Sequence, residues 1–170
     1  LFRSYLSPYS FDESVWTKIP RGTSDWNNYM SYYDSCYAMQ DGNLILRGIA
    51  NHTQKNDTAP YLTGGVYTKG KKLFTGGRVE VCARLQAAKG AWPAIWMLPE
   101  KAEWPKGGEI DIMERLNHDH IAYQTTHSYY THILGIKDNP PHGGINKINP
   151  EEYNIYSVDI YPDSLVFAVN

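Results

Sequence analysis

Three carboxylates lie within six residues of an otherwise apolar stretch, at Glu109, Asp111 and Glu114. The residues between them are isoleucines and a methionine, which favour a buried strand. Like charges this close repel one another and resist desolvation, so placing them here costs folding energy. Because acid clusters of this kind tend to mark functional sites, we interpret them as chemical groups. The alternative interpretation is an edge strand with an acidic solvent face.

The chemistry of the cluster depends on the face that each acid occupies. Strict alternation along a strand places Glu109 and Asp111 on one face and Glu114 on the other. A one-residue β-bulge near Ile112-Met113 would return Glu114 to the face of Glu109. Two carboxylates about 5 to 5.5 Å apart would then suit glycoside hydrolysis with retention, with one as nucleophile and the other as acid/base. Without the bulge, Glu114 would point into the core and this mechanism would fail.

Metal binding is the rival use of three acids. Calcium loops are flexible turns rich in Gly, Asn and backbone carbonyls, whereas these acids alternate with isoleucine on a predicted strand. His118 and His120 flank Asp119 without a clear partner for zinc. The pattern therefore predicts no metal centre and no required cofactor.

Aromatic residues flank the acid strand in the sequence. Three tryptophans precede it and three tyrosines follow it: Trp92, Trp96, Trp104, Tyr123, Tyr129 and Tyr130. Flat aromatic faces suit stacking on sugar rings. Trp92 and Trp96 have the same parity, so on one strand they would face the same way, into either the core or a groove. Beside an acid cluster, we expect at least one of them to stack on sugar.

Bulk composition excludes several classes of protein. The chain has 170 residues, enough for one domain with its own core. It carries 16 basic and 18 acidic side chains, for a net charge of −2, and has no basic tract, which argues against nucleic-acid binding. No apolar run reaches membrane-spanning length. Cys36 and Cys82 form no CxxC pair, and two free thiols are favoured over a single disulfide.

The elements that must position the acids are short strands. Alternating runs separated by Gly, Pro, Asn and Asp are typical of an all-β protein. Strands are predicted over residues 43–49, 65–69, 78–85, 92–98, 109–115, 122–128, 154–160 and 165–169. The last two would form a hairpin around Pro162-Asp163. This spacing indicates a sandwich of two antiparallel sheets. Such a sandwich with a long ligand groove usually needs more strands, so we expect further strands to follow Asn170.

The run from Gly108 to Glu114 resembles the active-site signature of glycoside hydrolase family 16. Several upstream segments are similar to that family at the expected distances, so that the resemblance spans most of residues 11–169: 26–28, 32–33, 41–44, 77–81 and 89–99. The family includes endo-β-1,3- and 1,3-1,4-glucanases, agarases, porphyranases, carrageenases and endo-β-galactosidases. The resemblance implies a β-jelly-roll with a concave substrate groove and a retaining mechanism.

The resemblance also implies roles for individual residues. Glu109 matches the nucleophile, Glu114 the acid/base and Asp111 the acid that assists them. The candidate sugar contacts are Asn28, Trp92, Trp96, Trp104, His127 and Tyr129. Of these, Asn28 matches a polar contact on the non-reducing side, and His127 matches a histidine beside the cleavage point. Members of the family commonly bind a structural calcium ion.

Two departures from the family bear on the substrate. Laminarin-type members usually carry an arginine in the strand that corresponds to residues 62–67, where this chain has none, and Tyr67 is a candidate replacement. Glucanases often have Glu where this chain has Tyr29. We therefore expect an endo-β-glycosidase acting on β-1,3 or mixed-linkage β-1,3-1,4-glucan, with two alternatives. One is an endo-β-1,4-galactosidase acting on poly-N-acetyllactosamine or mucin-type glycans, and the other a non-catalytic carbohydrate-binding jelly roll.

The substrate class predicts the protein's surroundings. Bulky polysaccharides do not enter cells, so an extracellular, cell-surface or periplasmic location is expected. Residues 1–170 are expected to form a single catalytic domain, completed by a C-terminal piece. A transglycosylase of the same fold would differ only in whether water or a sugar attacks the intermediate.

Overall fold

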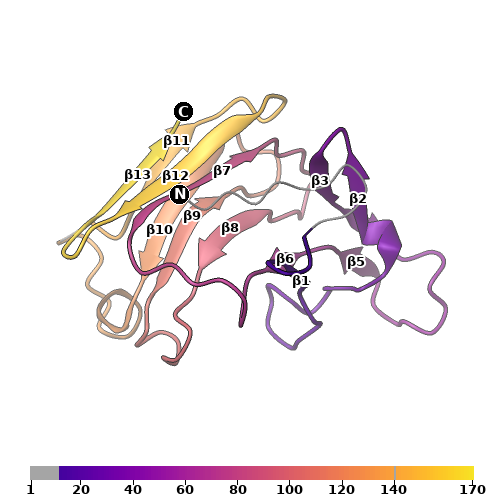
Figure 1. The fold of residues 1–170 in the computed structure, drawn as a ribbon, viewed down its shortest axis with the longest axis horizontal. Coiled ribbons are helices and arrows are strands. Elements are labelled where there is room, and N and C mark those ends of the chain that lie inside the picture. The colour runs from indigo at the N-terminus through magenta and orange to yellow at the C-terminus, as the bar shows by residue number, and fades with distance from the viewer. Residues whose placement is uncertain (1–11, 140) are drawn as a thin grey trace. The chain divides into compact units, whose positions relative to one another are not determined.

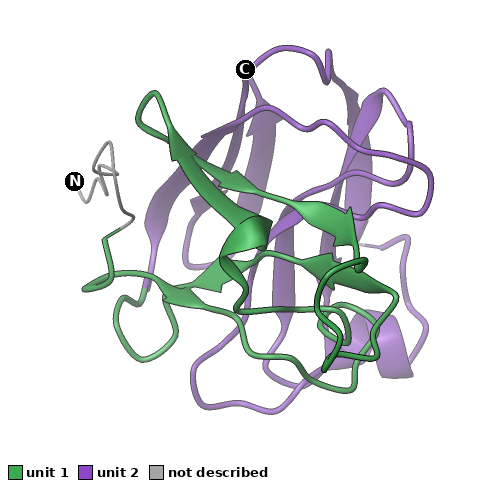
Figure 2. Ribbon diagram, turned by 90° about the vertical axis from the view of Figure 1, so that its right-hand side faces the viewer, with its two compact units in different colours: residues 1–73 green, residues 74–170 purple. Residues whose placement is uncertain are grey.

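The computed structural model describes residues 12–139 and 141–170. Position 11, where the family resemblance begins, lies outside the described residues. The chain divides into two compact units, one ending at Leu73 and the other running from Phe74 to Asn170 (Figure 2). That residues 1–170 form one catalytic domain stays a prediction. No helix within the described ranges is long and apolar enough to cross a membrane.

Two antiparallel sheets form the second unit (Figure 1). One sheet has the order β11-β10-β9-β8, with bounds Gly143–Lys147, Ile121–His127, Glu109–Glu114 and Ala94–Met97. The other has the order β13-β12-β7, with bounds Leu165–Val169, Asn154–Ile160 and Gly77–Ala83. The strand with the three acids, β9, is therefore an inner strand, paired with β10 on one side and β8 on the other.

The core of this unit lies between the two sheets. Its buried members come from both layers and the adjoining loops: Leu85, Ile112, Met113, Ala122, Ile148, Tyr156 and Val158. Burying a side chain of this size contributes about 1.5–3 kcal/mol. One face of β9 is thus committed to the core, which leaves the other face for its polar side chains.

The described residues of the first unit, 12–73, form three short antiparallel pairs and one 3₁₀ turn. The pairs are β1 (Thr17–Lys18) with β6 (Val66–Tyr67), β2 (Tyr37–Gln40) with β3 (Asn43–Leu46), and β4 (Gly48–Ala50) with β5 (Tyr61–Thr63). The turn η1 covers Asp34–Cys36. Cys36 is buried and Cys82 in the second unit is exposed, and both are free thiols, as expected.

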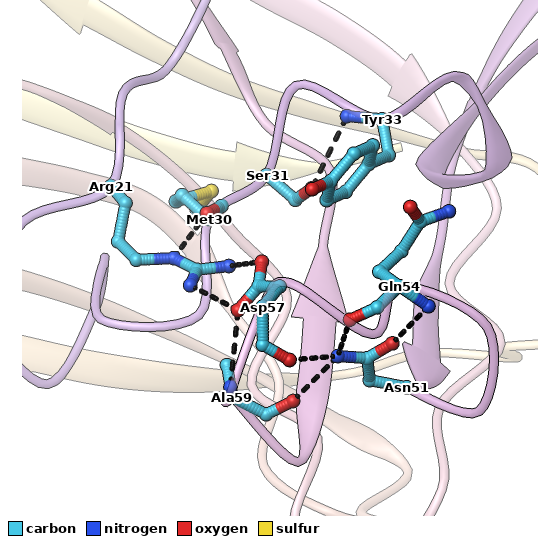
Figure 3. Close-up of polar contacts among 8 residues, drawn as sticks. All are labelled: Arg21, Met30, Ser31, Tyr33, Asn51, Gln54, Asp57 and Ala59. Carbon is cyan, nitrogen blue, oxygen red and sulfur yellow. Dashed lines mark hydrogen bonds and ion pairs between the residues drawn. The ribbon is translucent and has the colours of Figure 1, made fainter.

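A polar network holds the loop between β4 and β5 (Figure 3). Arg21 donates two hydrogen bonds to the carboxylate of Asp57, at 2.6 and 2.8 Å, and a third to the carbonyl of Met30. The hydrogen bonds from Arg21 lower the pKa of Asp57 below its ordinary value. The Asn51 amide donates to the carbonyls of Asp57 and Ala59. This loop is therefore closed by side chain–backbone bonds rather than by regular structure.

The predicted strands agree with the structure best where alternation is longest. Residues 154–160 and 165–169 coincide with β12 and β13, and their hairpin is confirmed. The prediction of one strand over 43–49 was wrong, because the chain changes partner at Arg47: β3 pairs with β2, whereas β4 pairs with β5. The strand predicted over 92–98 is confined to Ala94–Met97, so Trp92 precedes it. Four strands were not predicted: β1, β2, β5 and β11.

Candidate active site

The bulge in β9 that a retaining mechanism would require is present. On β10, Tyr123 lies opposite Glu114 and Thr125 lies opposite Asp111. Two residues along β10 therefore span the same length as three residues along β9. The other neighbour, β8, shows the same irregularity, with Ile95 opposite Met113 and the next residue opposite Asp111. One extra residue is therefore inserted in β9 between Asp111 and Glu114.

The bulge turns Glu114 back toward the other acids. Ile112 and Met113 are 1% and 0% exposed, although consecutive residues of a regular strand point to opposite faces. With both of these side chains in the core, Glu114 emerges on the open face of the sheet with Glu109 and Asp111. The charges of Glu109 and Glu114 both act on Asp111, which places the three acids close together.

Gln124 supplies the hydrogen bond that the bulge disrupts. An extra residue leaves a backbone group without its ladder partner, and such a group needs another when it is buried. The amide of Gln124, which is 3% exposed, donates to the carbonyl of Ile112 at 2.9 Å. The Gln124 oxygen in turn accepts a hydrogen bond from Asn146 on β11. The bulge is thus bonded to β10 through Gln124, and Gln124 is bonded in turn to β11 through Asn146.

Each of the two glutamates accepts a hydrogen bond from a tryptophan. Nε1 of Trp104 donates to Oε2 of Glu109 at 2.5 Å, and Nε1 of Trp92 donates to Oε1 of Glu114 at 2.8 Å. The two indoles are 48% and 53% exposed, so both combine a solvent-facing ring with a bonded N–H. Sequence reasoning assigned these tryptophans to sugar stacking, and their bonds to the acids are an additional finding.

Asp111 is the most perturbed of the three acids. Burial raises its pKa to about 8, with further contributions from the charges of Glu114 and Glu109 and from a hydrogen bond with Glu109. Nε2 of His127 lies 3.2 Å from Oδ2 of Asp111. This contact is not a directed hydrogen bond, because Oδ2 has no hydrogen-bond partner among the described residues. Asp111 is therefore set up to hold a proton at neutral pH.

The geometry matches a known family. The model of the XgeA-like catalytic domain of glycoside hydrolase family 16 matches residues 23–152, which include every acid described above. The chain belongs to family 16. The jelly-roll architecture expected from the sequence agrees with this assignment and with the two antiparallel sheets of the second unit.

Relatives within family 16 differ in the substrates that their names give. A keratan-sulfate endo-1,4-β-galactosidase of Sphingobacterium multivorum is 39% identical over 98% of this chain, and a β-glucanase of Rhodothermus marinus is 34% identical over 65%. The chain spans about 40% of the length of each. The laminarinase catalytic domain of Thermotoga maritima superimposes with a TM-score of 0.82 at 26% identity, covering 99% of this chain and 72% of that domain.

The remaining predicted family 16 contacts lie in different places. Trp96 is half-buried on β8 and is paired with Asp111 across the strands, so it borders the acids. Tyr129 is 44% exposed on a single π-helical turn, η2 (Tyr129–Ile133), directly after β10. Asn28 is half-buried in the first unit, where its backbone N–H donates to Ser24. The contacts of these residues with sugar stay predictions.

Two residues of the site were missed by sequence reasoning. Gln124 has a detectable signal, since a polar residue stands where the alternation of β10 points into the core. His132 has none, because the segment that carries it shows no strand or helix period. Within residues 12–139 and 141–170, no group of three or more His, Cys, Asp or Glu side chains is arranged to hold a metal ion. A structural calcium ion therefore stays a prediction without assigned ligands.

Proposed function

We propose that this chain carries the catalytic centre of a retaining endo-β-glycosidase. The observation that carries the proposal is the bulge at Ile112-Met113, which brings Glu109 and Glu114 to one face of β9 with Asp111 between them. Paired carboxylates on one face are what double displacement at a sugar requires. The indole N–H groups on both acids support the same interpretation, because they fix the two carboxylates in place.

The two glutamates then divide the reaction between them. Glu109 attacks the anomeric carbon, and the bond from that carbon to the leaving oxygen breaks as Glu114 gives the oxygen its proton. In the second step, Glu114 takes a proton from water while the water oxygen displaces Glu109 from the sugar. The configuration at the anomeric carbon is inverted twice and so retained.

Asp111 and His127 would tune the nucleophile. An Asp111 that keeps its proton at neutral pH can donate a hydrogen bond to Glu109 and so place no second charge against it. His127 borders Asp111 and lies opposite Glu109 in the strand ladder. From that position it can meet the sugar ring that Glu109 attacks.

For the substrate, we propose internal β-1,4-galactosidic linkages of a poly-N-acetyllactosamine type. The supporting observation is that the keratan-sulfate endo-galactosidase matches over 98% of this chain at 39% identity, whereas the β-glucanase matches over 65% at 34%. The missing arginine in residues 62–67 points the same way. β-1,3 or mixed-linkage glucan is the second candidate, and the likeness to a laminarinase domain favours it. Either polymer would place the enzyme outside the cell or in the periplasm.

Product analysis tests the proposal. The full-length protein is incubated with keratan sulfate, a mucin glycan, laminarin and barley glucan, and the oligosaccharides released are identified. Release of internal fragments from keratan or mucin glycans supports the galactosidase, and release from laminarin or barley glucan supports the glucanase. Glu109→Gln should lower kcat by several orders of magnitude and leave sugar binding intact, because only the nucleophile is lost. Binding without turnover in the wild type would instead indicate a carbohydrate-binding protein.

A further inference from the structure

We propose that His132 is a positioning residue of this active site, which holds the Trp104 indole where Nε1 can donate to Glu109. The inference rests on the proposed function, which makes Glu109 the nucleophile. The structure supports it through the contact between the two rings, the anchoring of the turn that carries His132 and the position of that turn beside Glu109.

The first observation is the contact between the two rings. The centroids of Trp104 and His132 are 4.4 Å apart, and the ring planes meet at 61°, an edge-to-face arrangement. Trp104 is 48% exposed, so the core encloses only part of it. A half-exposed indole can rotate about its side-chain torsions unless a neighbour restricts it. Glu109 accepts a hydrogen bond from the N–H of this indole, and the His132 ring contacts the indole ring.

The second observation is that the backbone of the turn that carries the exposed His132 side chain is held in place. It belongs to η2, the turn that begins directly after β10 and Ser128. The Ser128 hydroxyl accepts from the backbone N–H of Thr131, and the Thr131 hydroxyl accepts from the backbone N–H of Ser128. The N–H of His132 also donates to the carbonyl of Ser128 at 2.8 Å. π-helical turns are rare in proteins, and those that occur are frequently found at functional sites.

The third observation is where this turn starts. His127, the last residue of β10, is paired with Glu109 across the ladder, so η2 begins next to the nucleophile strand. The His127 and His132 rings are 6.5 Å apart. The contacts therefore form a closed circuit. Glu109 pairs with His127 at the end of β10, β10 leads to His132, His132 contacts Trp104, and Trp104 donates a hydrogen bond to Glu109. Removing the His132 side chain would remove the contact that links the turn to the Trp104 indole.

The kinetic test is a double-mutant cycle in the full-length protein. His132→Ala should lower kcat about 3- to 10-fold and change KM less, since a single aromatic contact is lost. His132→Phe retains an aromatic ring and should recover most of the rate. Because His132 acts through Trp104, His132→Ala should have little further effect in a Trp104→Phe background. An equal loss in both backgrounds would overturn the proposal.

An NMR measurement separates this proposal from the proposed function. In ¹⁵N-labelled protein, the indole N–H signal of Trp104 is assigned by its disappearance in Trp104→Phe. His132→Ala should shift or broaden this signal, and His132→Phe should leave it close to its wild-type position, whether or not the protein cleaves a given glycan. An unmoved Trp104 signal in His132→Ala would overturn the positioning role. If His132→Ala shifts the signal but the wild type cleaves no glycan, only the proposed function is rejected.

The control is His118→Ala, which makes the same change at an exposed histidine in the turn after β9. It should leave both kcat and the Trp104 signal unchanged. Thermal unfolding of every variant identifies any loss of rate that comes from a loss of fold. If His132→Phe is as slow as His132→Ala while both stay folded, the aromatic contact is not what His132 contributes, and the proposal is wrong.

Discussion

The indole nitrogen of Trp104 lies 2.5 Å from Oε2 of Glu109 and donates a hydrogen bond to it. An indole N–H is a donor only, so it can support negative charge on a carboxylate without exchanging a proton with it. Trp92 has the same relationship to Glu114. The two acids of the proposed mechanism are thus oriented by groups that take no part in proton transfer.

The first prediction concerns these indoles. Trp104→Phe should lower kcat about 10- to 100-fold, because a hydrogen bond to a charged group contributes about 1.5–3 kcal/mol. KM should change less, since a nucleophile, the role proposed for Glu109, contributes to the transition state rather than to binding. Steady-state kinetics on the best glycan measures both constants.

Trp92→Phe provides the matched comparison because its partner, Glu114, is the proposed acid/base. Its effect should be large on a natural glycan and small on an aryl glycoside with a good leaving group, for which no proton is needed in the first step. The Trp104→Phe effect should be present with both substrates. Equal responses of the two variants to the leaving group would contradict the assignment of nucleophile and acid.

A second prediction concerns Gln124, which donates to the carbonyl of Ile112 in the bulge. Gln124→Met keeps the length of the side chain and removes the donor, so it leaves a buried carbonyl without a partner. We expect a loss of about 1–3 kcal/mol in the free energy of unfolding, measured by urea denaturation, and a lower kcat.

The control for Gln124 is Asn146→Ala. This change removes the donor to the Gln124 oxygen and leaves the bond to Ile112 in place. Its effect on stability and kcat should be clearly smaller. If Asn146→Ala and Gln124→Met were equally damaging, the support of the bulge would come from the whole network rather than from the Ile112 bond.

The third prediction follows from the pKa of Asp111, which is about 8 in the folded chain against an ordinary value of 3.8. Between these values the folded state binds more protons than the unfolded state, so the contribution of Asp111 to stability falls as pH rises. Asp111→Asn removes this dependence. Relative to the wild type, the variant should therefore gain on the order of 4 kcal/mol between pH 4.5 and pH 8.5. Urea denaturation of both proteins at the two pH values measures this difference, and parallel pH dependences would count against it.

The fourth prediction concerns the loop between β4 and β5. The Asn51 side chain donates to two backbone carbonyls and accepts from the N–H of Gln54. Asn51→Ala should lower the free energy of unfolding by about 1–3 kcal/mol. Asn56→Ala, at an exposed position of the same loop, should change it by less than about 0.5 kcal/mol. Similar losses at both positions would mean that the bonds of Asn51 do not hold the loop.

Much of the catalytic strand could be predicted from the sequence, because its charges leave few alternatives. Strict alternation places Glu114 on the opposite face from Glu109, so the sequence already showed that a retaining mechanism requires a bulge near Ile112-Met113. The hairpin of β12 and β13 followed from unbroken alternation. By contrast, β11 has no apolar alternation, and its five residues, Gly143–Lys147, are all exposed. Only its pairing with β10 makes it a strand.

The surroundings of the acids could be predicted less well. That Trp92 and Trp104 bind carboxylates depends on where each indole edge points, and sequence spacing does not encode this. His132 owes its place to a π-turn capped by Ser128 and Thr131, a local hydrogen-bond arrangement without a period to detect. Side chains that alternate along strands are readable from sequence, and those on turns depend on tertiary contacts.

The bulge in β9 accommodates one extra residue between Asp111 and Glu114. Deleting Met113 alone would preserve all three acids, both tryptophan donors and every residue of β8 and β10. It would restore the regular two-residue period, and Glu114, then two positions after Asp111, would stay on the open face with Glu109 and Asp111. Glu114 would turn toward the core only if β9 kept Met113 and lost the bulge, because strict alternation would then place Glu109 and Glu114 on opposite faces.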